Sequence, residues 1–150
     1  MAAEFSELEQ RIRILEDIEA IKKLKARYWR CIDRKLWNEL EGCFAEDVLV
    51  DYGPDMQFRG REAALQFFRN VLGNASVITV HAGYGAEIEI LSDTTAKGIW
   101  ALSDYVITEP DSKMRGWAHY EDEYIKEGGK WKKKCTRITR IRQELITTSR

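Results

Sequence analysis

The feature that most constrains this chain is a change of periodicity near Ser76. Before it, apolar residues recur at three- and four-residue steps, which is typical of helices, and after it they alternate. The alternating part predicts four long strands, at roughly 76–91, 95–109, 114–127 and 130–147, with turns at "SDTT", "EPDS" and "EGGK". Helices followed by consecutive hairpins predict an α+β fold with a mainly antiparallel sheet.

The part before Ser76 predicts three helices. Ser6 and Glu9 are spaced as a capping box, which would start a helix of about 25 residues with a break near Asp17. Its apolar stripe comprises Leu8, Ile12, Leu15, Ile18, Ile21, Leu24, Tyr28 and Cys31. Shorter helices are expected at 35–44 and 61–72, with a strand in "DVLVDYG" between them.

A sheet of such long strands must twist and curve. Gly83 and Gly85 interrupt a strand pattern and predict a bulge that bends the sheet. We therefore expect the 150 residues to form one domain. It would be a cone-shaped α+β barrel in which the helices close the concave side around a pocket.

Composition and charge exclude several classes of function. The formal net charge of -1 provides no basic field for nucleic acid, and no apolar run is long enough to cross a membrane. The start "MAAEFSELEQ" lacks the features of a signal peptide, so we expect a cytoplasmic protein with its three cysteines as free thiols. Two distant histidines without Cys/His spacing predict no metal site.

One late strand places an acid on an apolar face, which comprises Trp100, Leu102, Asp104 and Val106. A buried acid needs a partner or a raised pKa, so Asp104 is a candidate site residue. The alternative is a structural ion pair, for which Arg140 is the available partner.

The next strand places Tyr120, Asp122 and Tyr124 on the inner face if Gly116 and Ala118 also point inward. Trp117 and His119 then point outward, where we read them as structural or at an interface. The basic run at 132–134 is read as a solvated strand end.

Three further residues are candidates for chemistry, and each also has a structural explanation. Tyr28 lies on the apolar stripe, where a core tyrosine is common. Asp33 lies just past the stripe and could simply cap the next helix. His81 shares strand parity with the polar Glu87 and Glu89, but one bulge in "HAGYG" would turn it to the concave face.

These residues stand within a wider resemblance. The segment "LEDIEAIKKLKARYWRCIDRKLWNELEGCFAEDVLVDYG" resembles SnoaL-like proteins of the nuclear-transport-factor-2-like superfamily, with a helix ending in Tyr and then Asp, a Trp-containing second helix and "F-x-x-D". The similarity continues through "GREAALQFF", "VHAGYGAEIEILSDTTAKGIW" and "YEDEYIKEGGKW", so it spans nearly the whole chain.

Within that superfamily, the chain resembles the bile-acid 7α-dehydratase and scytalone dehydratase group. The resemblance implies that Tyr28, Asp33 and His81 are catalytic, as in the bile-acid enzymes, and the Asp–His dyad alone matches the hexachlorocyclohexane dehydrochlorinases. Tyr84 stands where the bile-acid enzymes have a second His, and the segment after Arg142 is shorter. The residues expected to bind substrate are Tyr52, Trp100, Asp104, Tyr120 and Arg140.

The resemblance implies a cofactor-independent lyase, most simply a dehydratase. Its substrate would be a small hydrophobic molecule that is steroid-like, a polyketide or an aromatic precursor, and the protein would be a homo-oligomer, dimer or trimer. Two alternatives stay open: a ketosteroid-isomerase-like or polyketide-cyclase-like enzyme, and a non-catalytic binding or assembly subunit.

Overall fold

A computed structural model describes residues 2–109 and 112–147. Its elements follow one another as α1 (Ala2–Asp33), α2 (Trp37–Glu41), β1 (Phe44–Asp51), β2 (Gln57–Arg59), α3 (Arg61–Leu72), β3 (Ile78–Ile90), β4 (Thr95–Glu109), β5 (Ser112–Glu127) and β6 (Lys130–Thr147). The third helix and the four long strands lie close to their predicted positions. The middle of the predicted turn "EPDS" lies outside the described residues.

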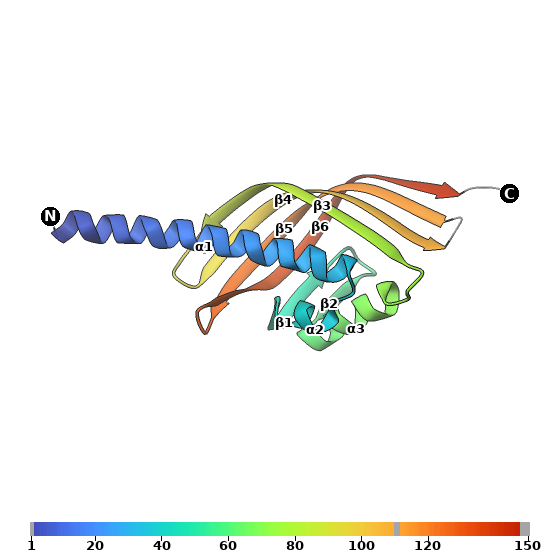
Figure 1. The fold of residues 1–150 in the computed structure, drawn as a ribbon, viewed down its shortest axis with the longest axis horizontal. Coiled ribbons are helices and arrows are strands. Elements are labelled where there is room, and N and C mark those ends of the chain that lie inside the picture. The colour runs from blue at the N-terminus through green and yellow to red at the C-terminus, as the bar shows by residue number, and fades with distance from the viewer. Residues whose placement is uncertain (1, 110–111, 148–150) are drawn as a thin grey trace.

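The strands form one sheet in the order β2-β1-β6-β5-β4-β3. Consecutive strands from β3 to β6 pair antiparallel, as predicted, but β1 lies parallel to β6, with Val50 opposite Thr136. The sheet is therefore mixed. It curves strongly, and α1 runs across its concave side while α2 and α3 cover β1 and β2 at one end (Figure 1). The predicted α+β cone is confirmed.

The bend in β3 comes from the predicted bulge. The register with β4 shifts between Tyr84 and Glu87, and Gly85 has a φ of 63°, which suits glycine. Gly83 serves a different purpose, because a Cβ there would lie 1.8 Å from the ring of Trp29. The bulge changes the strand's parity, so that His81 and Ile88 face the same concave side.

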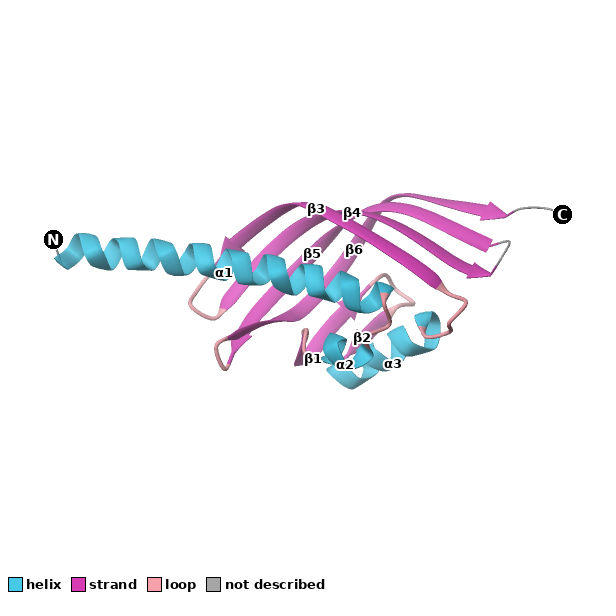
Figure 2. Ribbon diagram, in the orientation of Figure 1, coloured by secondary structure: helices cyan, strands magenta, loops and turns pink. Residues whose placement is uncertain are grey.

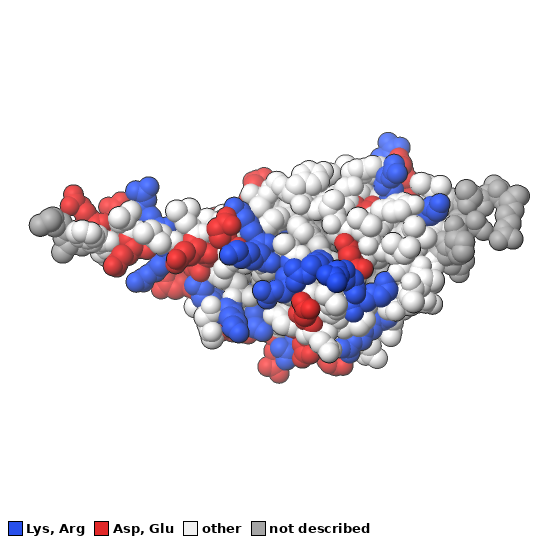
Figure 3. Space-filling view, in the orientation of Figure 1, with Lys and Arg blue, Asp and Glu red and all other residues white. Residues whose placement is uncertain are grey.

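Helix α1 is longer than predicted and only its second half is buried. Ser6 lies inside the helix and the chain passes Asp17 without a break, so the predicted capping box and break are wrong. The first half extends past the sheet (Figure 2), where the apolar Leu8, Ile12 and Leu15 are exposed. Charges of both signs lie along this helix (Figure 3). Among the described residues, no helix could span a membrane.

The predicted second helix at 35–44 is shortened at both ends. Lys35 has a φ of 55°, a left-handed conformation that ends α1, and the amide of Leu36 donates to the carbonyl of Cys31 at 2.8 Å. At the other end Phe44 already belongs to β1. Between α1, α3 and the sheet lies an aromatic core, in which Phe44 and Phe68 stack with centroids 6.2 Å apart.

Candidate active site

Asp33, the last residue of α1, and His81, near the start of β3, form a tight pair. The Nδ1 of His81 lies 2.6 Å from Oδ1 of Asp33. The carboxylate also accepts the Thr79 hydroxyl at 2.9 Å on Oδ1 and the His81 amide at 2.9 Å on Oδ2. An ionised carboxylate only accepts, so Nδ1 carries a proton and Nε2 of the neutral ring is left as the acceptor.

Local structure explains why this pair forms. Thr79 and His81 are two residues apart on a strand, so both side chains point to the same face and reach one carboxylate. The turn after α1 is tied to the start of the same strand, since Nζ of Lys35 donates to the carbonyl of Val77 at 2.6 Å. The end of the helix is thus held against β3 at two points.

His81 opens into a cavity of about 420 Å³ that lies between the helices and the concave sheet. The side chain of His81 is 10% exposed and that of Asp33 is 22% exposed, so a ligand in the cavity can reach the imidazole. The rest of the lining is largely apolar and aromatic: Tyr28, Ile32, Tyr52, Met56, Phe67, Phe68, Val71, Leu72, Thr79, Asp104, Val106, Met114, Tyr120, Ile138, Arg140 and Gln143. Such a lining suits a hydrophobic ligand.

Three tyrosines occupy one part of this lining. The hydroxyls of Tyr28 and Tyr52 lie 2.6 Å apart, and the ring of Tyr120 meets that of Tyr28 edge-on at 6.3 Å. Burial raises the pKa of Tyr28, Tyr52 and Tyr120 above the ordinary value of a phenol. All three therefore keep their protons at neutral pH and can donate hydrogen bonds.

Asp104 and Arg140 form the predicted ion pair in the cavity wall. Arg140 donates Nη1 and Nη2 to the two oxygens of Asp104 at 2.6 and 2.7 Å. Gly116 makes room for the pair, since a Cβ there would lie 2.3 Å from Nη1 of Arg140. Burial would lower the pKa of Arg140, but the hydrogen bonds and charge of Asp104 raise it. Arginine and carboxylate thus neutralise each other.

Trp100 does not line the cavity. It lies in the core, packs edge-on against Trp29 with centroids 5.5 Å apart, and donates its ring N–H to the hydroxyl of Tyr124 at 2.9 Å. The other four residues expected to bind substrate do line the cavity. As expected, Tyr120 and Asp122 point inward, and His119 is exposed on the other face.

Sequence reasoning missed a second ionic group, which lies in the core next to the tyrosines. Lys25 and Lys133 both donate to Oδ2 of Asp122, at 2.6 and 2.9 Å, and Tyr124 donates to the same oxygen at 2.8 Å. All three charged side chains are 0% exposed. The prediction of a solvated strand end at 132–134 is therefore wrong for Lys133.

The charges in this group shift one another's titration. Burial would raise the pKa of Asp122, but the ammonium groups of Lys133 and Lys25 hold it below its ordinary value. Burial lowers the pKa of Lys25 well below that of a free lysine, which Asp122 opposes and Lys133 reinforces. Asp122 therefore stays ionised, and Lys25 holds its proton less tightly than an exposed lysine.

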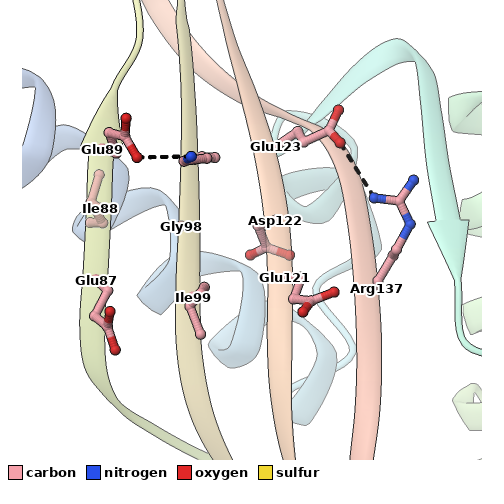
Figure 4. Close-up of a pocket in the computed structure, with 10 residues that line it drawn as sticks. Glu87, Ile88, Glu89, Gly98, Ile99, Glu121, Asp122, Glu123 and Arg137 are labelled. Carbon is pink, nitrogen blue, oxygen red and sulfur yellow. Dashed lines mark hydrogen bonds and ion pairs between the residues drawn. The ribbon is translucent and has the colours of Figure 1, made fainter.

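A larger hollow of about 590 Å³ lies on the convex side of the sheet. Figure 4 shows its charged rim, where Lys97 pairs with Glu89 at 2.8 Å and Arg137 with Glu123 at 3.3 Å. The side chain of Asp122 points away from this face and into the buried group with Lys25 and Lys133. The lining of this hollow contains neither a histidine nor a tyrosine, so the concave cavity is the candidate site.

The described residues contain no group of three potential metal ligands. The cysteines at 31, 43 and 135 are buried and free, and burial raises the pKa of Cys43 to about 11. A thiol with a raised pKa is a poor nucleophile at neutral pH.

Comparison with known proteins adds to this geometry. Residues 13–137 match the SnoaL-like domain, which is most of the chain. The chain belongs to the SnoaL-like family. The resemblance inferred from the sequence is thereby confirmed.

Solved structures show how widely this SnoaL-like fold is used. A candidate scytalone dehydratase from Novosphingobium aromaticivorans DSM 12444 superposes with a TM-score of 0.84 at 23% identity, covering 93% of both chains. The hexachlorocyclohexane dehydrochlorinase LinA-type3 from Novosphingobium barchaimii LL02 gives 0.81 at 20% identity, covering 91% of this chain and 94% of that one. A candidate aromatic ring hydroxylase from Novosphingobium aromaticivorans DSM gives 0.79 at 20% identity, covering 89% and 94%. At these identities the likeness establishes the fold, and the reaction must be argued from the site.

Proposed function

We propose that this SnoaL-like protein is a cofactor-independent lyase, a dehydratase that removes water from a hydroxy-carbonyl compound. The observation that carries the proposal is the 2.6 Å contact between Asp33 and His81, with the other ring nitrogen left for the cavity. A buried structural histidine would not need an acid that three donors hold in place. Two structural neighbours, a candidate scytalone dehydratase and a hexachlorocyclohexane dehydrochlorinase, support an elimination.

The proposed reaction uses one histidine as base and then as acid. Nε2 of His81 takes the proton from the carbon next to the carbonyl, and its positive charge is stabilised by Asp33. The hydroxyl of Tyr28 donates to the carbonyl oxygen, which becomes negative as the enolate forms. The enolate then expels the β-hydroxyl, which receives the proton held on Nε2. Water leaves, a carbon–carbon double bond remains, and His81 returns to its neutral form.

The lining indicates the class of substrate. Its polar groups are few, and the one cation among the lining residues, Arg140, is neutralised by Asp104. We infer an uncharged, hydrophobic, ring-containing molecule whose carbonyl lies against Tyr28. Steroid-like, polyketide and aromatic precursors all satisfy this description.

The test is a screen of cyclic hydroxy-ketones and hydroxylated aromatic precursors, without added metal or cofactor. We expect turnover that His81→Ala removes almost entirely while the circular dichroism spectrum and melting temperature stay close to those of the wild type. His119→Ala is the matched control, because this other histidine is exposed on the convex face, away from the cavity, and its loss should leave turnover unchanged. Equal rates for wild type and His81→Ala on the best substrate would disprove the assignment and favour a binding subunit.

Tyr28→Phe tests the second role. Loss of one donor to the oxyanion should lower kcat by roughly tenfold to a thousandfold. The phenyl ring retains the packing against Phe44 and Phe68, so the fold should survive. A proton transfer without loss of water, detected by deuterium exchange, would indicate an isomerase instead.

We also propose a cytoplasmic homo-oligomer. Large apolar side chains remain exposed on β3, β4 and β6, including Val80, Ile99 and Ile141. We infer that these side chains contribute to contacts between copies of the chain, because large apolar side chains on a protein surface can mark an interface. Sedimentation at micromolar concentration should reveal a dimer or trimer, and a monomer would contradict this proposal.

A further inference from the structure

The buried group contains more positive charge than it needs. One lysine neutralises Asp122, yet Lys25 and Lys133 both reach the same carboxylate oxygen, and the other oxygen, Oδ1, has no hydrogen-bond partner among the described residues. A second buried ammonium group loses its hydration and has no second carboxylate to offset that loss. A group with a purely structural role would therefore stabilise the fold better with one lysine.

The surplus charge lies against the tyrosines of the cavity. Nζ of Lys133 is 4.1 Å from the ring centroid of Tyr28, and Nζ of Lys25 is 3.3 Å from that of Tyr120. Neither lysine lines the cavity, so neither can touch a ligand there. Both can act on a ligand only through the phenols.

We propose that Lys133, held by Asp122 and supported by Lys25, is a positioning residue that strengthens Tyr28 as a hydrogen-bond donor to an anionic oxygen. This inference rests on the proposed function for its substrate, but it concerns the tyrosine end of the cavity and not His81. It assigns that end of the cavity to the substrate oxygen that becomes negative.

The physical reason is that the ring of Tyr28 becomes more negative as its hydroxyl proton shifts toward the ligand oxygen. A cation over an aromatic face is attracted to the ring's electrons, and this attraction grows as the oxygen becomes more negative. Asp122 opposes the effect, but Nζ of Lys133 lies over the ring of Tyr28 itself, and Tyr52 and Tyr120 are uncharged. Because Tyr28 and Lys133 are both buried, such interactions are screened less than in water.

The first experiment compares Lys133→Met with Lys134→Met. Lys134 is adjacent in sequence but points outward and pairs with Asp47 on the surface, so its removal should leave kcat unchanged. Lys133→Met leaves Asp122 paired with Lys25, so the protein should melt no lower than the wild type, while kcat falls on the order of tenfold. A lower melting temperature with unchanged kcat would show a purely structural lysine and overturn the inference.

A double-mutant cycle tests whether the effect passes through Tyr28. In the Tyr28→Phe background, Lys133→Met should cause less than a twofold further loss, because the donor that it supports is absent. An undiminished loss in that background would also overturn the inference.

A binding measurement separates this inference from the proposed reaction. The probe is 4-nitrophenol, whose absorbance reports the fraction bound as phenolate. Wild type and His81→Ala should favour the phenolate, and Lys133→Met should lose on the order of tenfold of this preference. If that pattern appears but no substrate is dehydrated, the inference stands and the proposed function falls. If His81→Ala abolishes turnover but the wild type shows no preference, the inference falls alone.

Discussion

Two ionic groups join α1 to the sheet, and they differ in both stoichiometry and access. Asp33 pairs one-to-one with His81 at the cavity, where both side chains remain partly exposed. Lys25, about two turns earlier on the same helix, shares Asp122 with Lys133 in a group that is sealed from solvent. The first arrangement leaves one nitrogen free for a ligand, and the second leaves none.

This difference predicts which property a variant changes. Changing the partly exposed pair of Asp33 and His81 should alter turnover and leave the free energy of unfolding nearly unchanged, because water can solvate the remaining partner. Removing the carboxylate of the sealed group should alter folding, because two buried ammonium groups then lose their counter-ion. Variants of the two carboxylates, Asp33 and Asp122, should therefore change different observables, which makes the comparison testable.

Asp33→Asn should produce the largest change. An asparagine amide cannot accept from both the His81 amide and Nδ1, so either a donor faces a donor or Nδ1 must become the acceptor. In the second case Nε2 carries the proton and cannot act as the base. We expect kcat to fall by on the order of a thousandfold to ten-thousandfold.

The measurement is steady-state kinetics on the best substrate, together with urea unfolding of the same preparation. The free energy of unfolding should change far less than the activation barrier. If the free energy of unfolding fell as much as the activation barrier rose, Asp33 would have a structural role, and the two groups would not differ as proposed.

Asp122→Asn should show the opposite pattern. It removes the carboxylate that Lys25 and Lys133 share, so two buried ammonium groups lose their counter-ion. Breaking such a group typically lowers the free energy of unfolding by about 3–5 kcal/mol. Urea unfolding monitored by tryptophan fluorescence measures it, with the surface variant Asp47→Asn as control. Equal stability of the two variants would show that the buried group is not structural.

The two groups also differ in how far the sequence predicted them. Helical spacing predicted that Tyr28 faces inward, and the bulge at Gly83 and Gly85 predicted that His81 could face the concave side. The proposal that Asp33 and His81 act together came from the family resemblance. Lysines in basic runs are normally solvated, so neither lysine was identified, although both had a positional signal. Lys25 lies four residues after Ile21 and three before Tyr28, on the buried face of α1. Lys133 shares strand parity with the buried Trp131 and Cys135.

Parts of the fold also depended on contacts that no local pattern records. The parallel pairing of β1 with β6 joins segments far apart in the chain, and the alternation within each strand is the same for either direction. The apolar stripe of α1 predicted a helix but not where the sheet stops covering it. Local periodicity therefore predicted the type and order of the elements better than their ends and their pairing.

A pH-dependence sharpens the comparison. Burial lowers the pKa of Lys25 in the folded protein, whereas the unfolded chain keeps the ordinary value of about 10.4. Between these two values the unfolded chain binds more protons, so this lysine makes the free energy of unfolding rise with pH. Below the folded pKa both states are protonated and the slope vanishes.

Lys25→Met removes this contribution, while the cysteines and tyrosines that also titrate at alkaline pH are present in both proteins. The wild-type minus variant difference in unfolding free energy should therefore rise with pH, by up to about 1.4 kcal/mol per unit within that window. Urea unfolding at a series of alkaline pH values measures it. A flat difference would mean that Lys25 titrates as an exposed lysine does.

The smallest expected effect concerns Lys35, which lies beside the dyad and far from the sealed group in sequence. Among the described residues it is the one non-glycine residue with positive φ, at 55°, and its Nζ holds the carbonyl of Val77 at 2.6 Å. Lys35→Met removes only the hydrogen bond, while Lys35→Gly removes the bond and the backbone strain. Urea unfolding should therefore find the glycine variant more stable than the methionine variant by roughly 1 kcal/mol. Both should lower kcat by the same factor if the bond holds Asp33 in place, and unchanged kcat in both would show that the dyad needs no such support.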